Sequence, residues 1–151
     1  MYGGIVGNRS GYSYLRVIYS LQEDEKEAST TNIAKALNIK PASVTEMINK
    51  LSKGGYLTHE PYKNVKLTAN GRKEAIKAIR RRRLLEDFLT RVLKIAKKDV
   101  LKQAETMEHS LTDKTEIELC RFLDRPMHDP IEHKPIPHCE KKISCGKNNY
   151  Q

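Results

Sequence analysis

The run E-T-M-E-H, residues 105–109, holds the side chains best suited to chemistry in this sequence. On an α-helix, positions i, i+3 and i+4 lie on one face, so Glu105, Glu108 and His109 would converge within one turn. Two carboxylates and an imidazole, without a thiolate, suit Mn²⁺ or Fe²⁺, and also Zn²⁺ or Co²⁺. The run therefore predicts a chelating helix face. The alternative is a solvated polar face, because glutamate is common on helix surfaces.

A second group of potential ligands lies near the C-terminus, where the composition changes to Pro, His and Lys. The spacing H-C-x₅-C in this segment lacks the paired C-x₂-C of structural zinc sites, so it is a weak zinc signature. Cys120 lies between Leu119 and Phe122 and is typical of a small buried hydrophobe. The residues of this potential tail site are His128, His133, His138, Cys139 and Cys145.

Several function classes are disfavoured by what the sequence lacks. It contains no Ser-His-Asp arrangement, Walker loop or dinucleotide glycine pattern, which argues against an enzyme and against a small-molecule substrate. No run of about 18 apolar residues occurs and the first residues lack the apolar core of a signal peptide. Three cysteines are an odd number, which argues against a disulfide framework. We therefore expect a cytoplasmic protein without a membrane partner.

The stretch from Ser29 to Leu67 has the pattern of a winged helix-turn-helix. Ser29 or Thr30 can cap a short helix, and Pro41 is well placed to start a second one, since proline lacks only an N–H that has no intrahelical partner there. Gly54-Gly55 ends the second helix, and two short apolar runs around a turn follow as a two-stranded wing. The apolar positions at helical spacing are Ile33, Ala34, Leu37, Val44, Met47, Ile48 and Leu51.

The second helix leaves small and hydrogen-bonding groups on its other faces. A helix that enters the major groove of DNA needs small side chains near its N-terminus and donors or acceptors for base edges. We therefore predict double-stranded operator DNA as a partner. A solvated helix face in a helical domain of another kind remains the alternative. The predicted DNA-binding residues are Thr30, Lys40, Pro41, Ala42, Ser43, Thr45 and Glu46, with Lys63 and Lys66 in the wing.

The charge of the chain is unevenly distributed. The formal net charge is +9, and residues 35–83 contain 13 basic and 3 acidic residues, which leaves 15 basic and 16 acidic residues elsewhere. The whole excess of positive charge thus falls on the winged helix and the segment after it. Such a concentrated basic segment is expected of a protein that contacts phosphates. We expect basic charge near the DNA-binding module from the first half of the long helix, at Arg72, Lys73, Lys77 and Arg80–Arg83.

The rest of the chain predicts a mainly α protein. A first helix precedes the helix-turn-helix, and Thr68 can cap a long connecting helix. Two further helices, Asp99–His109 and Thr112–Leu123, would form a second core that is small enough to need a second copy of the chain, so we expect a homodimer. We predict a winged-helix DNA-binding domain at 1–70, a helical metal-binding and dimerisation domain at 71–137, and a flexible tail at 138–151. The apolar residues expected in this second core are Val100, Leu101, Ala104, Met107, Ile117, Leu119, Phe122 and Leu123.

Five segments in order closely resemble the diphtheria toxin repressor and manganese transport regulator family. They are Y-L-R-V-I-Y, I-A-K-A-L-N-I-K-P-A-S-V-T-E-M-I-N-K-L, K-L-T-A-N-G-R, R-R-R-L-L-E-D-F-L and M-E-H-S-L-T-D, and the match covers about residues 12 to 137. The resemblance implies a dimeric repressor of metal uptake genes that is activated by a divalent metal. It also implies that Glu105, Glu108 and His109 are ligands of the regulatory site and that Glu86 serves a second metal.

The chain departs from the family at several ligand positions. Arg82 stands where members usually have a ligand histidine, and Leu101 where some iron-responsive members have another. Ser13 stands where Asp or Met usually supplies an N-terminal ligand, and Arg16 where manganese-responsive members have Glu. Arg82 lies four residues before Glu86, so its guanidinium could replace the second metal as a fixed cation. The alternative is a plain surface arginine in a basic run.

These features of the sequence are consistent with two functions. The first is a divalent-metal-dependent repressor that binds operator DNA as a dimer, with Ser13, a backbone carbonyl or water completing the metal coordination. The second is a metal-independent winged-helix regulator in which the ligand face has decayed. Measuring operator binding while the protein is titrated with divalent metals distinguishes these two functions.

Overall fold

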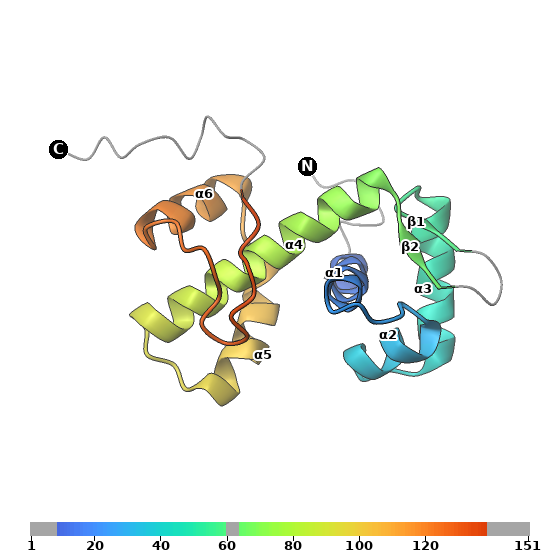
Figure 1. Ribbon diagram of the computed structural model, residues 1–151, viewed down its shortest axis with the longest axis horizontal. Helices are drawn as coiled ribbons and strands as arrows, with labels where there is room; N and C mark the ends of the chain where they lie inside the picture. Colours follow the sequence, from blue (N-terminus) through green and yellow to red (C-terminus); the bar gives the residue numbers. More distant parts are fainter. Residues whose placement is uncertain (1–8, 60–63, 139–151) are drawn as a thin grey trace. The chain divides into compact units, whose positions relative to one another are not determined.

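A computed structural model describes residues 9–59 and 64–138, which form a mainly helical fold (Figure 1). The chain divides into two compact units, one up to Ala78 and one from Ile79 onward, and each is described by itself. The elements in order are α1 (Arg9–Glu23), α2 (Thr30–Leu37), α3 (Pro41–Lys53), β1 (Leu57–Thr58), β2 (Lys66–Leu67), α4 (Ala69–Asp87), the π-helical turn η2 (Phe88–Val92), α5 (Lys97–Glu108) and α6 (Asp113–Phe122).

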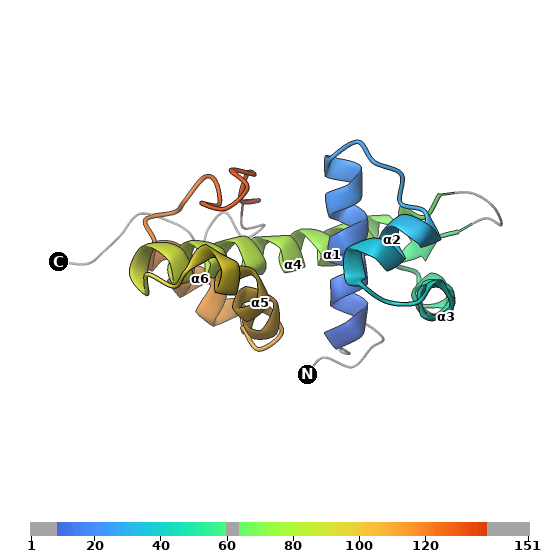
Figure 2. The same cartoon turned by 90° about the horizontal axis from the view of Figure 1, so that it is seen from below.

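The N-terminal unit has the predicted winged helix-turn-helix. Helix α1 packs against α2 and β2, α2 against α3, and α3 against β1 (Figure 2). The strands pair antiparallel, with Leu57 opposite Leu67. One apolar cluster forms the core of this unit: Tyr14, Leu15, Val17, Ile18, Ala28, Ile33, Ala34, Val44, Ile48, Leu51, Leu57, Val65 and Ala75.

The ends of these helices follow from their capping residues. The Ser29 side chain accepts a hydrogen bond from the Asn32 N–H, and Asn38 closes α2 in the left-handed conformation at φ 54°. Pro41 occupies the first turn of α3, as predicted. These caps confine the turn between the two helices to Asn38–Lys40.

Thr68 joins the wing to the start of α4. Its N–H donates to the Tyr56 carbonyl at 3.1 Å, its hydroxyl donates to the Gly55 carbonyl at 2.7 Å, and the same oxygen accepts from the Gly71 N–H at 3.0 Å. A Cβ on Gly71 would lie 1.8 Å from the Tyr56 carbonyl oxygen. Only glycine permits this close approach of α4 to the backbone of Tyr56, just before β1.

The C-terminal unit consists of the second half of α4, η2, α5, α6 and a strap of residues 124–138 (Figure 1). Its buried apolar residues are Ile79, Leu84, Leu85, Leu89, Val100, Ala104, Cys120, Leu123, Ile131 and Ile136. Cys120 is a buried free cysteine, as predicted. Leu123 caps the C-terminus of α6, and Thr112 caps its N-terminus by accepting from the Thr115 N–H.

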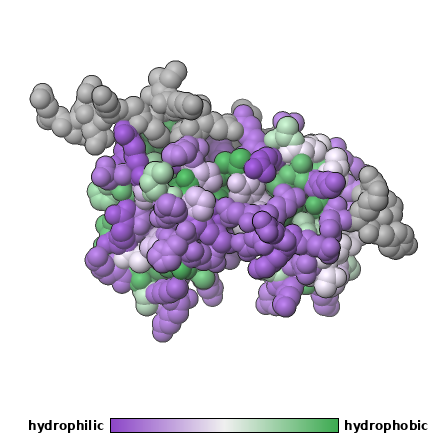
Figure 3. Space-filling view, in the orientation of Figure 1, coloured by the Kyte–Doolittle hydropathy of each residue, from purple (hydrophilic) through white to green (hydrophobic). Residues whose placement is uncertain are grey.

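Three residues that the sequence placed in this second core are exposed in the single chain. Phe122 is 67 % exposed, Leu101 is 38 % and Met107 is 37 %. The strap residues Ile131 and Ile136 instead contribute to the core, and they carry no helical periodicity that could predict this. Figure 3 shows hydrophilic residues over most of the drawn face, with apolar side chains in small areas among them.

Candidate functional site: a carboxylate cluster around Arg82

The predicted DNA-reading helix α3 presents its polar face to solvent. Pro41, Ala42, Ser43, Thr45 and Glu46 are all exposed. The Thr45 hydroxyl donates to the Pro41 carbonyl at 3.2 Å, which orients the side chain along the first turn. Small, exposed groups in the first turns of this helix fit the close approach that base-edge contact requires.

Helix α3 is anchored by Tyr14 of α1. The Tyr14 hydroxyl donates to the Ser43 carbonyl at 3.3 Å, and burial, with a smaller contribution from Glu46, raises the pKa of this phenol. Of the other predicted DNA-binding residues, Lys40 and Lys66 are exposed and Thr30 is half-buried. Lys63 lies outside the described residues.

Two opposite charges on α3, Lys50 and Glu46, form an ion pair within the helix. Lys50 Nζ donates to Glu46 Oε1 at 2.7 Å, and this hydrogen bond and charge lower the pKa of the Glu46 carboxyl. The ion pair follows the i, i+4 spacing of a helix, with both side chains more than half exposed.

The predicted chelating run lies at the C-terminal end of α5. Glu105 and Glu108 belong to the helix, which ends one residue earlier than the sequence indicated. His109 is its C-cap and keeps right-handed helical angles (φ −74°, ψ −17°), so the expected i, i+3, i+4 spacing is retained. The Glu108 side chain is 2 % exposed, that of His109 11 % and that of Glu105 47 %. His109 Nε2 lies 3.7 Å from Glu108 Oε1.

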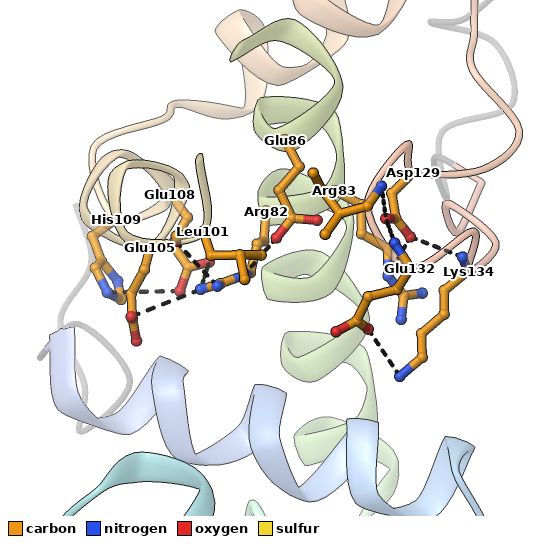
Figure 4. A network of polar contacts seen from close by, with 11 residues as sticks. Arg82, Arg83, Glu86, Leu101, Glu105, Glu108, His109, Asp129, Glu132 and Lys134 are labelled. Atoms are coloured by element: carbon orange, nitrogen blue, oxygen red, sulfur yellow. Dashed lines mark hydrogen bonds and ion pairs between the residues drawn. The ribbon is translucent and has the colours of Figure 1, made fainter. Parts of the chain in front are cut away.

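Arg82 of α4 reaches this turn from the side (Figure 4). Its Nε donates to Glu86 Oε1 at 2.9 Å, and its Nη2 donates to the Leu101 carbonyl at 3.1 Å. Its Nη1 lies 3.9 Å from Glu108 Oε2 and 4.0 Å from Glu105 Oε2. A single guanidinium thus lies among three carboxylates.

Glu86 is held within this cluster and is 4 % exposed. Burial raises the pKa of its carboxyl, the Arg82 charge and hydrogen bond act against this increase, and Asp129 and Glu132 add to it. The expected role of Glu86 toward a second metal stays a prediction.

The donor set at 105–109 suits a divalent ion chemically, and Glu108 and His109 already lie close together. Within residues 9–59 and 64–138, however, no group of three or more His, Cys, Asp or Glu side chains is gathered to hold a metal ion. Ser13 lies on α1 in the N-terminal unit, and its role as a ligand stays a prediction. The cysteines of the potential tail site lie outside the described residues.

The sequence predicts basic charge near the DNA-binding module at Arg80–Arg83, but three of these four side chains are buried. Arg80, Arg81 and Arg83 are each 4 % exposed and lie in the C-terminal unit. Arg80 Nε and Arg81 Nε donate to the two oxygens of Glu116, at 2.7 and 2.9 Å. Carboxylates that are distant in the sequence compensate these charges, which a local charge count cannot reveal.

Two residues that shape this unit have no clear signal in the sequence. Glu116 joins α6 to α4 through the two arginines. Asp129 accepts backbone hydrogen bonds from Ile131, Glu132 and Lys134 and so shapes the strap. The Asp-Pro step at 129–130 is typical of a turn, but nothing in the residue pattern indicates these partners.

A winged helix-turn-helix whose helix α3 leaves small polar groups exposed, followed by a helical unit with a carboxylate and imidazole face, is typical of a DNA-binding regulator with a candidate metal site. Two sequence families match the chain. The iron-dependent repressor N-terminal DNA-binding domain matches residues 10–65, and the iron-dependent repressor metal-binding and dimerisation domain matches residues 68–138.

Individual proteins give the same result. The HTH-type transcriptional regulator MntR of Geobacillus kaustophilus is 38 % identical over 99 residues, which cover 66 % of this chain and 70 % of the relative. An uncharacterised HTH-type transcriptional regulator of Methanocaldococcus jannaschii is 36 % identical over 113 residues, 74 % of this chain and 90 % of the relative. A solved structure of a manganese-dependent transcriptional repressor in complex with manganese aligns with a TM-score of 0.78 at 33 % identity, over 85 % of this chain and 58 % of that one.

The chain therefore belongs to the diphtheria toxin repressor and manganese transport regulator family of metal-dependent transcriptional repressors. It spans about three fifths of the length of the solved repressor structure that it matches. No helix of the described segments is long and apolar enough to cross a membrane.

Proposed function

We propose that this protein is a divalent-metal-dependent repressor that binds operator DNA as a homodimer and controls metal-ion uptake genes. Mn²⁺ or Fe²⁺ is the proposed activating ion, because relatives carry the name MntR and one solved relative is described as manganese-dependent. The observation that carries the proposal is the buried Glu108 beside His109, within a domain matched to metal binding and dimerisation.

In this proposal the exposed face of α3 reads bases. Ser43 and Thr45 offer hydroxyls and a methyl group, whereas Lys66 of the wing offers a charge to phosphate. Ser43→Ala or Thr45→Ala should relax the sequence preference, while Lys66→Ala should weaken binding to all duplexes and reduce the salt slope by about one. Equal losses of affinity on operator and random DNA for all three variants would contradict the assignment.

The proposed dimer uses the apolar side chains that the C-terminal unit leaves exposed. Phe122, at 67 % exposure, packs edge-to-face against Phe88 with ring centroids 6.4 Å apart. Val92, Leu93 and Met127 are 41 %, 50 % and 58 % exposed. The protein should sediment as a dimer at micromolar concentration, and Phe122→Asp should shift it toward monomer. A monomeric wild type, with and without metal, would exclude this interface.

Metal binding would act on DNA binding by shifting a population. A tenfold change in operator affinity requires only about 1.4 kcal/mol of difference in metal binding between the two conformations. The residues proposed to hold the ion are Glu105, Glu108 and His109. Their carboxylates and imidazole would bind and orient the ion, and the ion itself would supply positive charge.

The test is operator binding of the purified protein during titration with Mn²⁺, Fe²⁺, Zn²⁺ and Co²⁺. His109→Ala and Glu105→Ala should abolish the stimulation by metal while leaving weak non-specific DNA binding intact. His128→Ala is a matched control, because this exposed imidazole lies in the strap outside the proposed ligand set. A His109→Ala variant that responds to metal like the wild type would exclude this site.

A metal-independent winged-helix regulator is the second candidate. It is favoured by the finding that no three potential ligands are gathered around one point within the described parts of the chain. In that case the operator affinity of the wild type would be the same with chelator and with any of the four metals.

A further inference from the structure

Arg82 occupies an unusual place for a cation in a basic run. Its side chain is 13 % exposed, and its Nη1 is fully buried. The neighbouring Arg80 and Arg81 donate to Glu116, and Arg83 donates to the Pro135 carbonyl, whereas Arg82 is directed toward the carboxylates of α5. A plain surface arginine is therefore excluded.

Two hydrogen bonds fix the guanidinium in place. Helix spacing gives the bond from Nε to Glu86, four residues further along α4. The bond from Nη2 to the Leu101 carbonyl ties the same group to α5. The remaining nitrogen, Nη1, is thereby directed to Glu105 and Glu108 at 4.0 and 3.9 Å (Figure 4). The planar fork of arginine suits such simultaneous contacts better than the ammonium of lysine.

The charge of the cluster then limits how many ions it can accept. Glu86, Glu105 and Glu108 carry a charge of −3 when ionised, and Arg82 reduces this to −2. One divalent ion brings the cluster to neutrality, whereas two would leave it at +2, which is costly for mostly buried groups. The acidic neighbours of the cluster do not change this balance, because Asp129 lies 4.0 Å from Arg83 and Glu132 pairs with Lys134 at 3.2 Å.

We infer that Arg82 is a cation built into the metal site, so that the site takes one divalent ion per protomer and Glu86 is the counterion of Arg82 rather than a metal ligand. The inference rests on the proposed function, since it assumes that the ion binds at Glu105, Glu108 and His109. Arg82 acts here as a positioning residue: it holds Glu86 and sets the charge that the ion meets.

The test is isothermal titration calorimetry of the whole chain with Mn²⁺ and Co²⁺, combined with the Co²⁺ absorption spectrum. Ions bound at this site are counted as the equivalents that the wild type binds and that either His109→Ala or Glu86→Gln loses, which removes any contribution from the C-terminal histidines and cysteines. We expect one equivalent per protomer. Glu86→Gln should keep that equivalent, with an unchanged Co²⁺ spectrum.

Variants of Arg82 separate its charge from its shape. Arg82→Met should lower the melting temperature of the metal-free protein by more than about 5 °C, because three carboxylates lose their shared cation. It should also increase the stabilisation by metal and tighten binding of the first ion at least about tenfold, since a guanidinium no longer repels the ion at short range. Arg82→Lys, which retains the charge, should bind one equivalent. Arg121→Met is the matched control, because it removes a charge paired with Glu118 on the surface of α6.

The possible results are distinct. Two equivalents at this site in the wild type, one of them lost in Glu86→Gln, would overturn the inference and leave the proposed function intact. If His109→Ala binds as many metal equivalents as the wild type, or if the wild type binds no metal, the proposed function itself would be contradicted. An Arg82→Met variant that matches Arg121→Met in metal-free stability and in metal affinity would show that Arg82 has no role in the site.

Discussion

The two units of this protein are stabilised by different kinds of side chain. In the N-terminal unit, every buried side chain among residues 11–59 and 64–78 is apolar apart from the Tyr14 hydroxyl. In the described part of the C-terminal unit, eight charged side chains are buried, and all of them follow Ala78: Arg80, Arg81, Arg83, Glu86, Asp87, Glu108, Glu116 and Asp129.

The N-terminal unit is therefore stabilised by apolar packing, whereas the stability of the C-terminal unit also depends on how its buried charges are paired. The apolar core positions α3 and the strands of the wing without charged groups, so its stability depends little on salt, pH or metal ions. A core of arginines and carboxylates costs desolvation energy and stabilises the fold only while every charge keeps its partner. A divalent ion that enters such a core can change its stability directly, which suits a unit proposed to sense metal.

The largest expected effect is the loss of Glu116. Its carboxylate compensates Arg80 and Arg81, and both arginine side chains are 5 % exposed. Glu116→Ala should destabilise the C-terminal unit by about 3–5 kcal/mol, because two buried guanidinium groups lose their shared partner. Glu118→Ala, which breaks only an exposed pair with Arg121, should cost less than about 1 kcal/mol. Urea denaturation of both variants measures the difference, and similar losses would show that the buried ion pairs of this unit contribute no more than an exposed pair.

An apolar substitution in the N-terminal unit should have a comparable but slightly smaller effect. Leu51 is fully buried, so Leu51→Ala should cost about 2–5 kcal/mol through lost burial and a residual cavity. Leu51→Met, which nearly conserves the volume, should cost less than about 1.5 kcal/mol. The loss should be the same at pH 6 and pH 8, because no charged group contributes to it. A strong pH dependence would show that the apolar description of this unit is incomplete.

Gly71→Ala should have an intermediate effect. Alanine normally stabilises a helix relative to glycine by about 1 kcal/mol, but here the new Cβ would meet the Tyr56 carbonyl oxygen. The clash should make the substitution destabilising by about 1–3 kcal/mol. Asn70→Ala, an exposed position in the same turn, should be neutral or slightly stabilising. Thermal unfolding of the pair checks this, and a stabilised Gly71→Ala would exclude the close approach.

The smallest expected effect concerns the exposed pair on α3. Because the pKa of Glu46 is lowered by Lys50, the pair stabilises the fold above the unfolded pKa of glutamate, about 4.3, and this contribution is lost as the pH falls through the lowered folded value. An NMR titration of the Glu46 carboxyl should therefore have its midpoint below the unfolded pKa, and Lys50→Ala should raise the midpoint. An identical midpoint in both proteins would mean that the pair does not form in solution.

The sequence is a good guide to the apolar unit and a poorer guide to the charged one. Ile33, Val44 and Ile48 lie at helical spacing, and burial follows that spacing directly. In the C-terminal unit the same reasoning assigns Phe122 to the core, although the single chain leaves it largely exposed. From the sequence, Arg80–Arg83 is interpreted as a solvated basic run. The sequence does not show that Arg80 and Arg81 are buried against Glu116, because Glu116 lies more than thirty residues further along the chain.

The candidate site shows the same division. The spacing of Glu105, Glu108 and His109 depends only on one helical turn, so the sequence could predict it. The position of Arg82 depends on how α4 meets α5 and on a backbone carbonyl at Leu101, neither of which any residue pattern encodes. The sequence could therefore offer Arg82 only as one of two alternatives, and the three-dimensional contacts decide against the surface arginine.

Hydrogen exchange with and without Mn²⁺ tests most directly the claim that the charged unit is the one that responds to metal. With saturating Mn²⁺, amide exchange should slow in the last turn of α5 and in the second half of α4, and Glu108→Ala should remove this protection. The core of α3 in the N-terminal unit should exchange at the same rate with or without the ion. Metal protection that persists unchanged in Glu108→Ala, or that is confined to the winged helix, would contradict this account.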